Sequence, residues 1–234
     1  MSPAGLKLRR FPDAAAVASA VADQVESAAA RALHMRGEFV LVLAGGTTPR
    51  AVYEILARRS TRRPGWRFLF GDARCVARGD SSRNDAMARD AWFSRIDVDS
   101  DQILPIPAEL GPEAGAARYA ETLQSFGAFD LVLLGIGEDG HTASLFPGHE
   151  WGTGADAPAA LPVFDSPKPP PTRVSLSANR LGLAQRVLVL ATGSGKAEPL
   201  EALLRGDQTP LAALSPQAGL ELFCDEHAAR NIKS

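Results

Sequence analysis

The chain has 234 residues, of which 45% are hydrophobic and 22% charged, and its formal net charge is -2 at pH 7. These values predict one globular domain, residues 1–234, and argue against nucleic acid or an anionic membrane as a partner. The N-terminus lacks the apolar core of a signal peptide, and no apolar run approaches the ~20 residues of a membrane span. The two cysteines, Cys75 and Cys224, make no disulfide framework, so we expect buried thiols in a cytoplasmic protein.

The first predicted elements are a helix and a strand that opens into a glycine-rich turn. Alanine and valine recur at helical spacing from Asp13, the predicted N-cap, to about Met35, and Gly37 follows as a stop. The apolar strand Phe39–Leu43 then leads into Gly45-Gly46-Thr47-Thr48-Pro49, where Thr48 is the predicted helix N-cap and Pro49 suits the first helical turn. Such a turn can bind an anion, because unpaired N–H groups and the helix dipole point at the ligand. An ordinary strand-to-helix turn has the same shape, so both interpretations stay open here.

A second strand, Trp66–Phe70, ends just before Asp72 and Arg74. Arg74 is a candidate for binding a ligand oxyanion, because a guanidinium presents a fixed fork of donors. The structural alternative is a surface salt bridge with Asp72 or Asp80. The pattern beyond this point predicts a polar loop at 77–84, a helix at 85–93, a short strand near 103–106 and a helix at 112–126.

The next strand leads into the stretch that carries most of the expected chemistry. Leu131–Leu134 is a continuous apolar run, which is typical of a strand buried on both faces in a parallel sheet. The run ends at Gly135-Ile-Gly137-Glu-Asp139-Gly140-His141, where glycines permit a sharp turn and a carboxylate and an imidazole lie two residues apart. Ligands of open α/β sheets bind just beyond the carboxyl ends of strands, so this turn is a candidate active site.

Gly135, Gly137 and Gly140 also match the dinucleotide-binding pattern G-x-G-x-x-G. That pattern requires a long helix directly after it and an acidic residue about 20 residues further on. Pro147 and Gly148 end any helix after barely two turns. We therefore expect no nicotinamide or flavin cofactor.

The last third of the chain begins with an irregular segment, residues 151–171, rich in Gly, Pro and Ala, which we expect to be a long loop framing the site. Arg173–Ser177 alternates apolar and polar residues like a strand, and further strands are predicted at 186–191 and 221–224. The predicted sequence of alternating strands and helices indicates an α/β fold with a doubly wound, mainly parallel sheet and helices on both faces.

The segment Gly193-Ser-Gly195-Lys196 resembles a P-loop. It stands at the start of a predicted helix that runs through Arg205. The first glycine of that motif would fall at Leu190, however, and Ala197 replaces the Ser/Thr that would hold magnesium. Nucleoside triphosphate is therefore not expected, although a lysine at a glycine-rich helix start suits one phosphate group. The four histidines are scattered and no Cys/His cluster has zinc-ligand spacing, so we expect no metal.

Taken as a string, G-x-G-x-D-G-H-T-A-S-L-F-P-G at 135–148 resembles the signature of the 6-phosphogluconolactonases, the sugar-phosphate lactonases of the pentose phosphate pathway. Residues 45–49 resemble the family's glycine-rich phosphate loop, 70–76 its second signature, 173–177 its third, and 193–196 a lysine-bearing loop near its C-terminus. Two departures stand out. Ala73 replaces a usual glutamate, and Arg83-Asn84 replaces a usual Ser-Asn pair.

The resemblance implies hydrolysis of 6-phospho-D-glucono-1,5-lactone to 6-phosphogluconate. We also expect a monomer that needs no cofactor or metal and whose partner is this sugar phosphate. His141 is the expected general base, Asp139 orients it, and Arg74 or backbone N–H groups of the turn stabilise the carbonyl oxygen. How Arg74, Arg173 and Lys196 divide between phosphate and carbonyl stays open. The expected substrate-binding residues are Gly45, Gly46, Thr47, Thr48, Asp72, Gly137, Arg173 and Lys196.

Two alternatives share the expected fold. The related glucosamine-6-phosphate deaminases usually have Asp-Glu-Tyr after their strand and Ile-Gly-Phe-Asn-Glu-Pro after Gly-His, where this chain has Arg74 and residues 142–147. A non-catalytic sugar-phosphate sensor would keep the phosphate loop but would not need His141.

Overall fold

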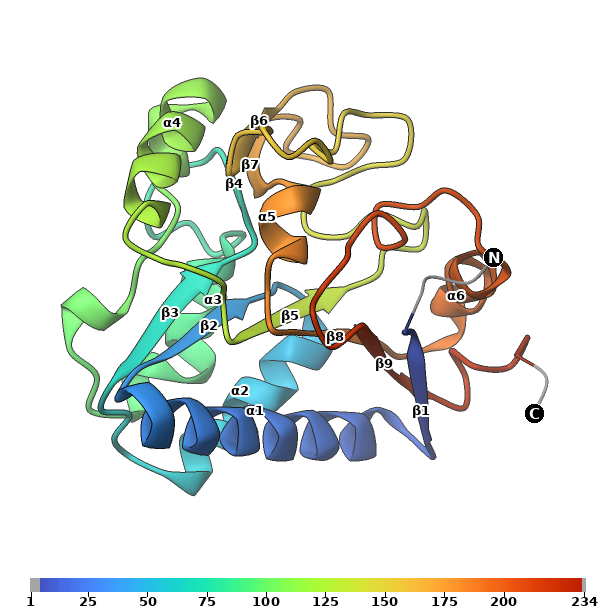
Figure 1. Ribbon diagram of the computed structural model, residues 1–234, viewed down its shortest axis with the longest axis horizontal. Helices are drawn as coiled ribbons and strands as arrows, with labels where there is room; N and C mark the ends of the chain where they lie inside the picture. Colours follow the sequence, from blue (N-terminus) through green and yellow to red (C-terminus); the bar gives the residue numbers. More distant parts are fainter. Residues whose placement is uncertain (1–4, 233–234) are drawn as a thin grey trace.

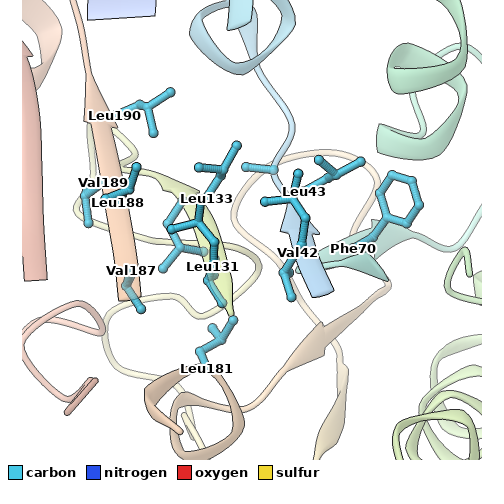
Figure 2. Close-up of a cluster of buried hydrophobic side chains, with 14 of the residues drawn as sticks. Val42, Leu43, Phe70, Leu131, Leu133, Leu181, Val187, Leu188, Val189 and Leu190 are labelled. Carbon is cyan, nitrogen blue, oxygen red and sulfur yellow. The ribbon is translucent and has the colours of Figure 1, made fainter. Parts of the chain in front are cut away.

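The apolar runs form a six-stranded sheet in the computed structural model, which describes residues 5–232 (Figure 1). Every neighbouring pair in this sheet is parallel, as the long apolar strands predicted. Figure 2 shows Leu133 of the central strand between aliphatic side chains of the strands on either side. The strands stand in the order β1 (Lys7–Phe11), β9 (Leu220–Asp225), β8 (Arg186–Ala191), β5 (Leu131–Gly135), β2 (Phe39–Leu43) and β3 (Trp66–Phe70).

The strand order reverses between β2 and β5. From β2 the chain first adds β3 on one side, and it later adds β5 on the other side of β2. In an open α/β sheet the loops leaving two such strands diverge and leave a crevice at the carboxyl ends. In this chain those loops are the two glycine-rich turns, after Leu43 and after Leu134. The topology therefore brings together two segments that are far apart in the sequence.

Helices lie on both sides of this sheet, as predicted (Figure 1). Asp13 caps α1 (Ala14–Arg36) by accepting a hydrogen bond from Ala16 N at 2.8 Å, and Gly37 ends it with a φ of 72°. α1 and α2 (Thr47–Arg59) cover one face, and α4 (Pro112–Leu123) lies with the second sheet on the opposite side. The shorter helices are α3 (Asn84–Ala91), α5 (Ala178–Gly182) and α6 (Ala197–Arg205), with 3-10 turns at Phe93–Arg95, Ser100–Gln102, Ala108–Leu110 and Ser194–Lys196.

A second, three-stranded antiparallel sheet closes one side of the crevice. Its order is β4 (Asp72–Arg74), β7 (Arg173–Leu176) and β6 (Ala160–Val163). The predicted strand at 173–177 is confirmed to within a residue, but it belongs to this sheet and not to the parallel one. The prediction that 151–171 is one long loop is wrong, because β6 lies within it.

Two further sequence predictions about strands need correction. The strand near 103–106 does not form, and Ile103 makes only an isolated bridge to Phe68. Pro105 and Pro107 have no N–H to donate, so a ladder cannot continue there. β1 was not predicted, because its short Lys-Leu-Arg-Arg-Phe pattern is mostly exposed at the edge of the sheet.

The remaining expectations concern the cysteines and the membrane. Cys224 is buried as expected, whereas Cys75 is only half-buried, and both thiols are free. None of the helices within residues 5–232 combines the length and the apolar character that crossing a membrane requires.

Candidate active site

A pocket of about 480 Å³ lies at the carboxyl ends of β2, β3, β5 and β8, where the strand order reverses. The sequence-predicted residues that line it come from both sheets and from the start of α2. They are Gly45, Gly46, Thr47, Thr48, Asp72, Arg74, Gly137, His141, Arg173 and Lys196. Asp139 does not line the pocket itself but contacts His141. The structure thus gathers the predicted residues around one cavity.

His141 and Asp139 form a hydrogen-bonded pair on the turn after β5. His141 Nδ1 is 2.5 Å from Asp139 Oδ1, so the contact that a spacing of two residues did not guarantee is present. A carboxylate only accepts, which makes Nδ1 the protonated nitrogen and leaves the lone pair on Nε2. The ring also packs on Phe146, with centroids 4.8 Å apart. The pair therefore presents a held imidazole with one basic nitrogen available.

The glycines of this turn have different tasks. A Cβ on Gly137 would lie 2.0 Å from His141 Nδ1 and 2.3 Å from Asp139 Oδ1, so only glycine leaves room for the pair. Gly140 has a φ of +85°, a conformation that L side chains rarely adopt. Gly137 lines the pocket as predicted, and its small size is what the pair requires.

Burial decides the protonation of the pair. Desolvation lowers the pKa of His141 below its ordinary value, and this outweighs the raising effect of Asp139. Desolvation alone would raise the pKa of Asp139, but its hydrogen bond to His141 and nearby positive charge lower it overall. Near neutral pH the pair is thus a neutral imidazole donating to a carboxylate.

The loop after β2 differs from the prediction in one detail. α2 begins at Thr47, so Gly46, with a φ of +108°, occupies the N-cap position and the prediction of Thr48 as N-cap is wrong. Arg50 N makes the first helical bond, to Gly46 O at 3.1 Å, and Pro49 has no N–H. The backbone N–H groups of Thr47 and Thr48 therefore have no partner inside the helix, which suits an anion.

Thr48 instead joins two strand-end loops. Its Oγ1 is 2.6 Å from Oγ1 of Thr192, which follows β8 and also lines the pocket. The side chain of Thr48 thus joins two loops instead of capping α2, because Gly46 already occupies the N-cap position.

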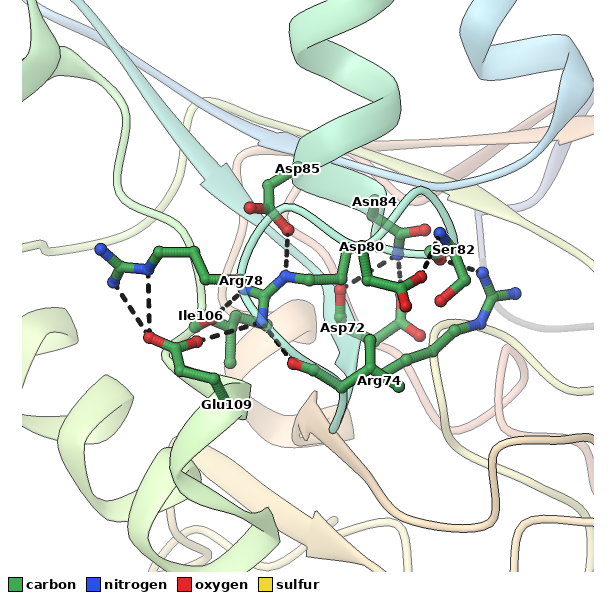
Figure 3. Close-up of polar contacts among 11 residues, drawn as sticks. Asp72, Arg74, Arg78, Asp80, Ser82, Asn84, Asp85, Ile106 and Glu109 are labelled. Carbon is green, nitrogen blue, oxygen red and sulfur yellow. Dashed lines mark hydrogen bonds and ion pairs between the residues drawn. The ribbon is translucent and has the colours of Figure 1, made fainter.

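Asp72 is a buried hub that joins three elements. Its contacts with Asn84 are seen in Figure 3. Asn84 Nδ2 donates to its carboxylate at 2.8 Å and to its carbonyl at 3.0 Å, while Ser144 Oγ donates to its other carboxylate oxygen at 2.6 Å. A Cβ on Gly45 would lie 2.1 Å from Asn84 Oδ1, so the glycine-rich loop packs directly on this hub. The contacts use both carboxylate oxygens of Asp72 within the protein.

Arg74 lies beside this hub with no ion-pair partner among the described residues. It donates to the carbonyl of Ser82, and no ion pair to Asp72 or Asp80 forms within residues 5–232. The surface salt bridge that was its alternative explanation is therefore absent there. Ala73, where the resembling family usually has glutamate, is buried and, by strand alternation, faces away from its neighbours Asp72 and Arg74.

Arg173 lines the pocket, but most of its contacts hold a loop. Its Nη2 donates to the carbonyls of Lys168 at 2.8 Å and Pro169 at 3.3 Å, and its Nε donates to that of Pro170 at 3.3 Å. The guanidinium also lies 5.5 Å from the centroid of the Phe146 ring. Burial lowers its pKa. The structure thus adds a loop-anchoring task to the predicted ligand-binding one.

Two lysines face the pocket, and sequence reasoning identified only one. Lys196, in the 3-10 turn before α6, makes no ion pair within the described residues, and burial lowers its pKa. Lys168 was missed, although it stands in the segment predicted to frame the site. Its Nζ lies 3.7 Å from Asp139 Oδ1. The signal that could have identified Lys168 from the sequence is that it is a lysine in a proline-rich segment expected to frame the site.

Arg83 was also missed; it lines the pocket and forms a charged cluster with Asp85 and Glu109. Its guanidinium is almost fully buried and donates to Asp85 at 2.8 Å, Glu109 at 3.0 Å and the carbonyl of Ile106 at 2.7 Å. Figure 3 shows Glu109 and Asp85 converging there from separate elements. Arg83, which stands where the resembling family usually has serine, thus anchors the loop that carries Ser82 and Asn84.

No group of three or more His, Cys, Asp and Glu side chains within residues 5–232 is arranged to hold a metal ion. The chemistry on offer at this site is therefore a neutral imidazole with an oriented lone pair, backbone N–H groups, and the side chains of Arg74, Lys168 and Lys196. Such a set can activate water and bind an anion.

Comparison with known proteins points to one family. Residues 12–223 match the family described as glucosamine-6-phosphate isomerases/6-phosphogluconolactonase. A 6-phosphogluconolactonase from Rattus norvegicus is 37% identical over 209 residues, which cover 83% of this chain and 81% of the relative. The structure of a 6-phosphogluconolactonase from Thermotoga maritima superposes with a TM-score of 0.86 at 26% identity, covering 94% of this chain and 99% of the other.

The fold alone does not separate the two activities in that family description. The structure of a monomeric glucosamine-6-phosphate deaminase superposes with a TM-score of 0.80 at 22% identity, covering 96% of this chain and 99% of the other. At that identity the likeness shows the fold only. The residues around the pocket must therefore carry the functional argument.

Proposed function

Since the chain belongs to the glucosamine-6-phosphate isomerase/6-phosphogluconolactonase family, we propose that it hydrolyses 6-phospho-D-glucono-1,5-lactone to 6-phosphogluconate, a step of the oxidative pentose phosphate pathway. The observation that carries this proposal is the neutral imidazole of His141, held by the Asp139 carboxylate, at a pocket that also holds cationic side chains without ion-pair partners within the described residues. Hydrolysis of a lactone needs an activated water and a place for an oxyanion, and both are available here.

His141 acts as the general base in this proposal. Its Nε2 takes a proton from water, and the resulting hydroxide attacks C1 to form a tetrahedral oxyanion. When the bond between C1 and the ring oxygen breaks, Nε2 returns the proton to that oxygen, which becomes a hydroxyl group. The new carboxylic acid then loses its proton to solvent. Asp139 keeps the proton on Nδ1 throughout, so that Nε2 always faces the reaction.

The other groups position the substrate and stabilise charge. Lys196 and the first N–H groups of α2 bind the 6-phosphate, because both offer positive charge that no described side chain neutralises by an ion pair. Arg74 and backbone N–H groups of the turn after β5 face the developing oxyanion. Anchoring the phosphate aligns C1 with the water, which converts binding energy into rate.

The direct test is turnover of freshly prepared lactone by the purified protein. 6-Phosphogluconate formation should exceed spontaneous hydrolysis by orders of magnitude, with His141→Ala as the matched inactive control. EDTA should leave the rate unchanged, and restoration by a divalent ion after loss in EDTA would contradict a metal-free mechanism. Conversion of glucosamine 6-phosphate instead would assign a deaminase, and tight sugar-phosphate binding without turnover would assign a sensor.

We also propose that the protein works as a monomer in the cytoplasm, with the sugar phosphate as its only partner. The residues that the proposed reaction uses gather around one pocket of a single chain, which supports this part of the proposal. Size-exclusion chromatography with light scattering should give one mass near 24.7 kDa at assay concentration. A stable dimer would contradict this part of the proposal.

A further inference from the structure

Lys168 belongs to the reaction centre by geometry, although it lies 27 positions beyond His141 in the segment between β6 and β7. Its Nζ lies 3.7 Å from Asp139 Oδ1, the same oxygen that is 2.5 Å from His141 Nδ1. One carboxylate oxygen therefore faces both the imidazole and the ammonium group. This places the positive charge of Lys168 next to the His141–Asp139 pair that activates the water.

The backbone of Lys168 is held from two sides. Arg173 donates to its carbonyl at 2.8 Å, and the hydroxyl of Ser166 donates to the same carbonyl at 2.9 Å. Ser166 Oγ also accepts from Lys168 N at 3.3 Å. A buried guanidinium and a buried hydroxyl are thus committed to placing this one residue at the mouth of the pocket.

The side chain of Lys168, by contrast, is free to change partners. It is 44% exposed, and its contact with Asp139 is a single long ion pair, which in a solvated setting is worth little. An ammonium group carries three donors on a flexible stem, so it can turn from Asp139 to a ligand oxygen without moving the backbone. A fixed Cα with an exchangeable head group suits a ligand-binding role.

The position of Lys168 relative to the base identifies which end of the ligand it meets. Nε2 of His141 must lie beside C1, because the water it activates adds there. Hydrolysis turns the C1 carbonyl into a carboxylate, so negative charge develops at this end and stays in the product. A cation beside the His141–Asp139 pair therefore faces the C1 oxygens, while the phosphate is left to Lys196 and the start of α2.

We propose that Lys168 binds the C1 oxygens of the ligand, first the lactone carbonyl and then the product carboxylate, and is released to Asp139 when the pocket empties. This inference rests on the proposed lactonase function and extends it by assigning the two lysines of the pocket to opposite ends of the substrate.

The experiment compares two ligands that differ only at C1. 6-Phosphogluconate carries a carboxylate there, and glucitol 6-phosphate carries a hydroxymethyl group in its place. Both are titrated calorimetrically into the wild type, Lys168→Met and the matched control Lys196→Met at fixed pH and ionic strength. Lys168→Arg tests whether positive charge alone restores binding.

Lys168→Met should weaken 6-phosphogluconate by about 10- to 100-fold and leave glucitol 6-phosphate within about twofold, because only the charged C1 contact is lost. Lys196→Met should weaken both ligands to the same extent. Lys168→Arg should recover most of the 6-phosphogluconate affinity. Thermal melting of each variant checks that the fold is retained.

Equal weakening of both ligands by Lys168→Met would overturn the inference and make Lys168 a phosphate ligand. No change for either ligand would show that it does not touch the ligand at all. In both cases lactone turnover by the wild type would stand, so only the assignment of Lys168 would fail. A wild type that neither hydrolyses the lactone nor binds 6-phosphogluconate would instead overturn the proposed function, and this inference with it.

Discussion

Two clusters of charged side chains flank the pocket, and they are built differently. The anchor cluster, Arg83 with Asp85 and Glu109, surrounds a guanidinium whose side chain is 1% exposed. Each of its three nitrogens donates to a carboxylate or a backbone carbonyl. The reaction cluster, Asp139 with His141 and Lys168, is partly open to solvent, and His141 Nε2 has no hydrogen-bond partner within the described residues.

The difference shows that burial and charge do not by themselves mark a functional group. In the anchor cluster the cost of removing a charge from water is offset by bonds within the protein, so nothing is left to react. In the reaction cluster one carboxylate orients its neighbours while a basic nitrogen and most of an ammonium group stay available. Polar atoms without a partner, next to groups that hold them in a fixed orientation, mark a functional site better than burial or charge does.

The largest effect should come from removing the reactive nitrogen. His141→Ala should lower kcat by about 10²–10⁴-fold, the usual contribution of a positioned general base. The melting temperature and 6-phosphogluconate binding should stay close to wild type, because the imidazole makes few structural contacts. Steady-state kinetics with calorimetry as the folding control measure this. If His141→Gln kept most of kcat while Asp139→Asn lost it, Asp139 would be the base.

The anchor cluster should show the opposite behaviour. Arg83→Met should lower the free energy of unfolding by about 3 kcal/mol, because Asp85 and Glu109 then lose their buried counter-charge; this is the lower end for buried pairs, since both carboxylates keep some exposure. Arg78→Met is the matched control, because Arg78 contacts the same Glu109 from an exposed position and should cost less than about 1 kcal/mol. Urea denaturation compares the two, and equal losses would contradict the distinction.

Lys196 belongs to neither cluster, and its removal should have an effect of intermediate size, on ligand affinity. Lys196→Ala should weaken 6-phosphogluconate by about 1.5–3 kcal/mol, the value of a lost charge-assisted contact. Unphosphorylated gluconate should bind the variant and the wild type almost equally. Calorimetric titration of both ligands decides this, and parallel weakening of the two would show that Lys196 does not touch the phosphate.

The smallest predicted effect is a shift in pH dependence. His141 is active only when neutral, and burial lowers its pKa, so kcat/KM should fall only as pH drops through a value below the ordinary ~6.5. Asp139 opposes that lowering, so Asp139→Asn should move the acid limb to still lower pH. Rate profiles of both proteins measure the shift, and an acid limb displaced to higher pH would rule out this arrangement.

Local sequence patterns predicted the regular elements well where the pattern was long. α1 with its Asp13 cap, the five-residue strands β2 and β3 and the buried β5 all appear where predicted. The failures were segments that contain proline or lie mostly exposed at a sheet edge. Prolines removed the donors of the strand expected near 103–106, and β6 was hidden in a stretch whose four strand residues include Pro162. Such segments depend on a partner strand that the local sequence does not specify.

The sequence by itself determined the turn at 135–148, because its glycines, Asp139 and His141 lie within a few positions and their contacts are local. Only the tertiary structure decided the contacts between distant segments: Asp72 with Ser144, Arg83 with Glu109, and Lys168 with Asp139. These side chains meet because β4, β7 and the loops around them fold over the crevice between β2 and β5. No periodicity encodes such a meeting, since it depends on where whole elements pack and not on the spacing of residues within them.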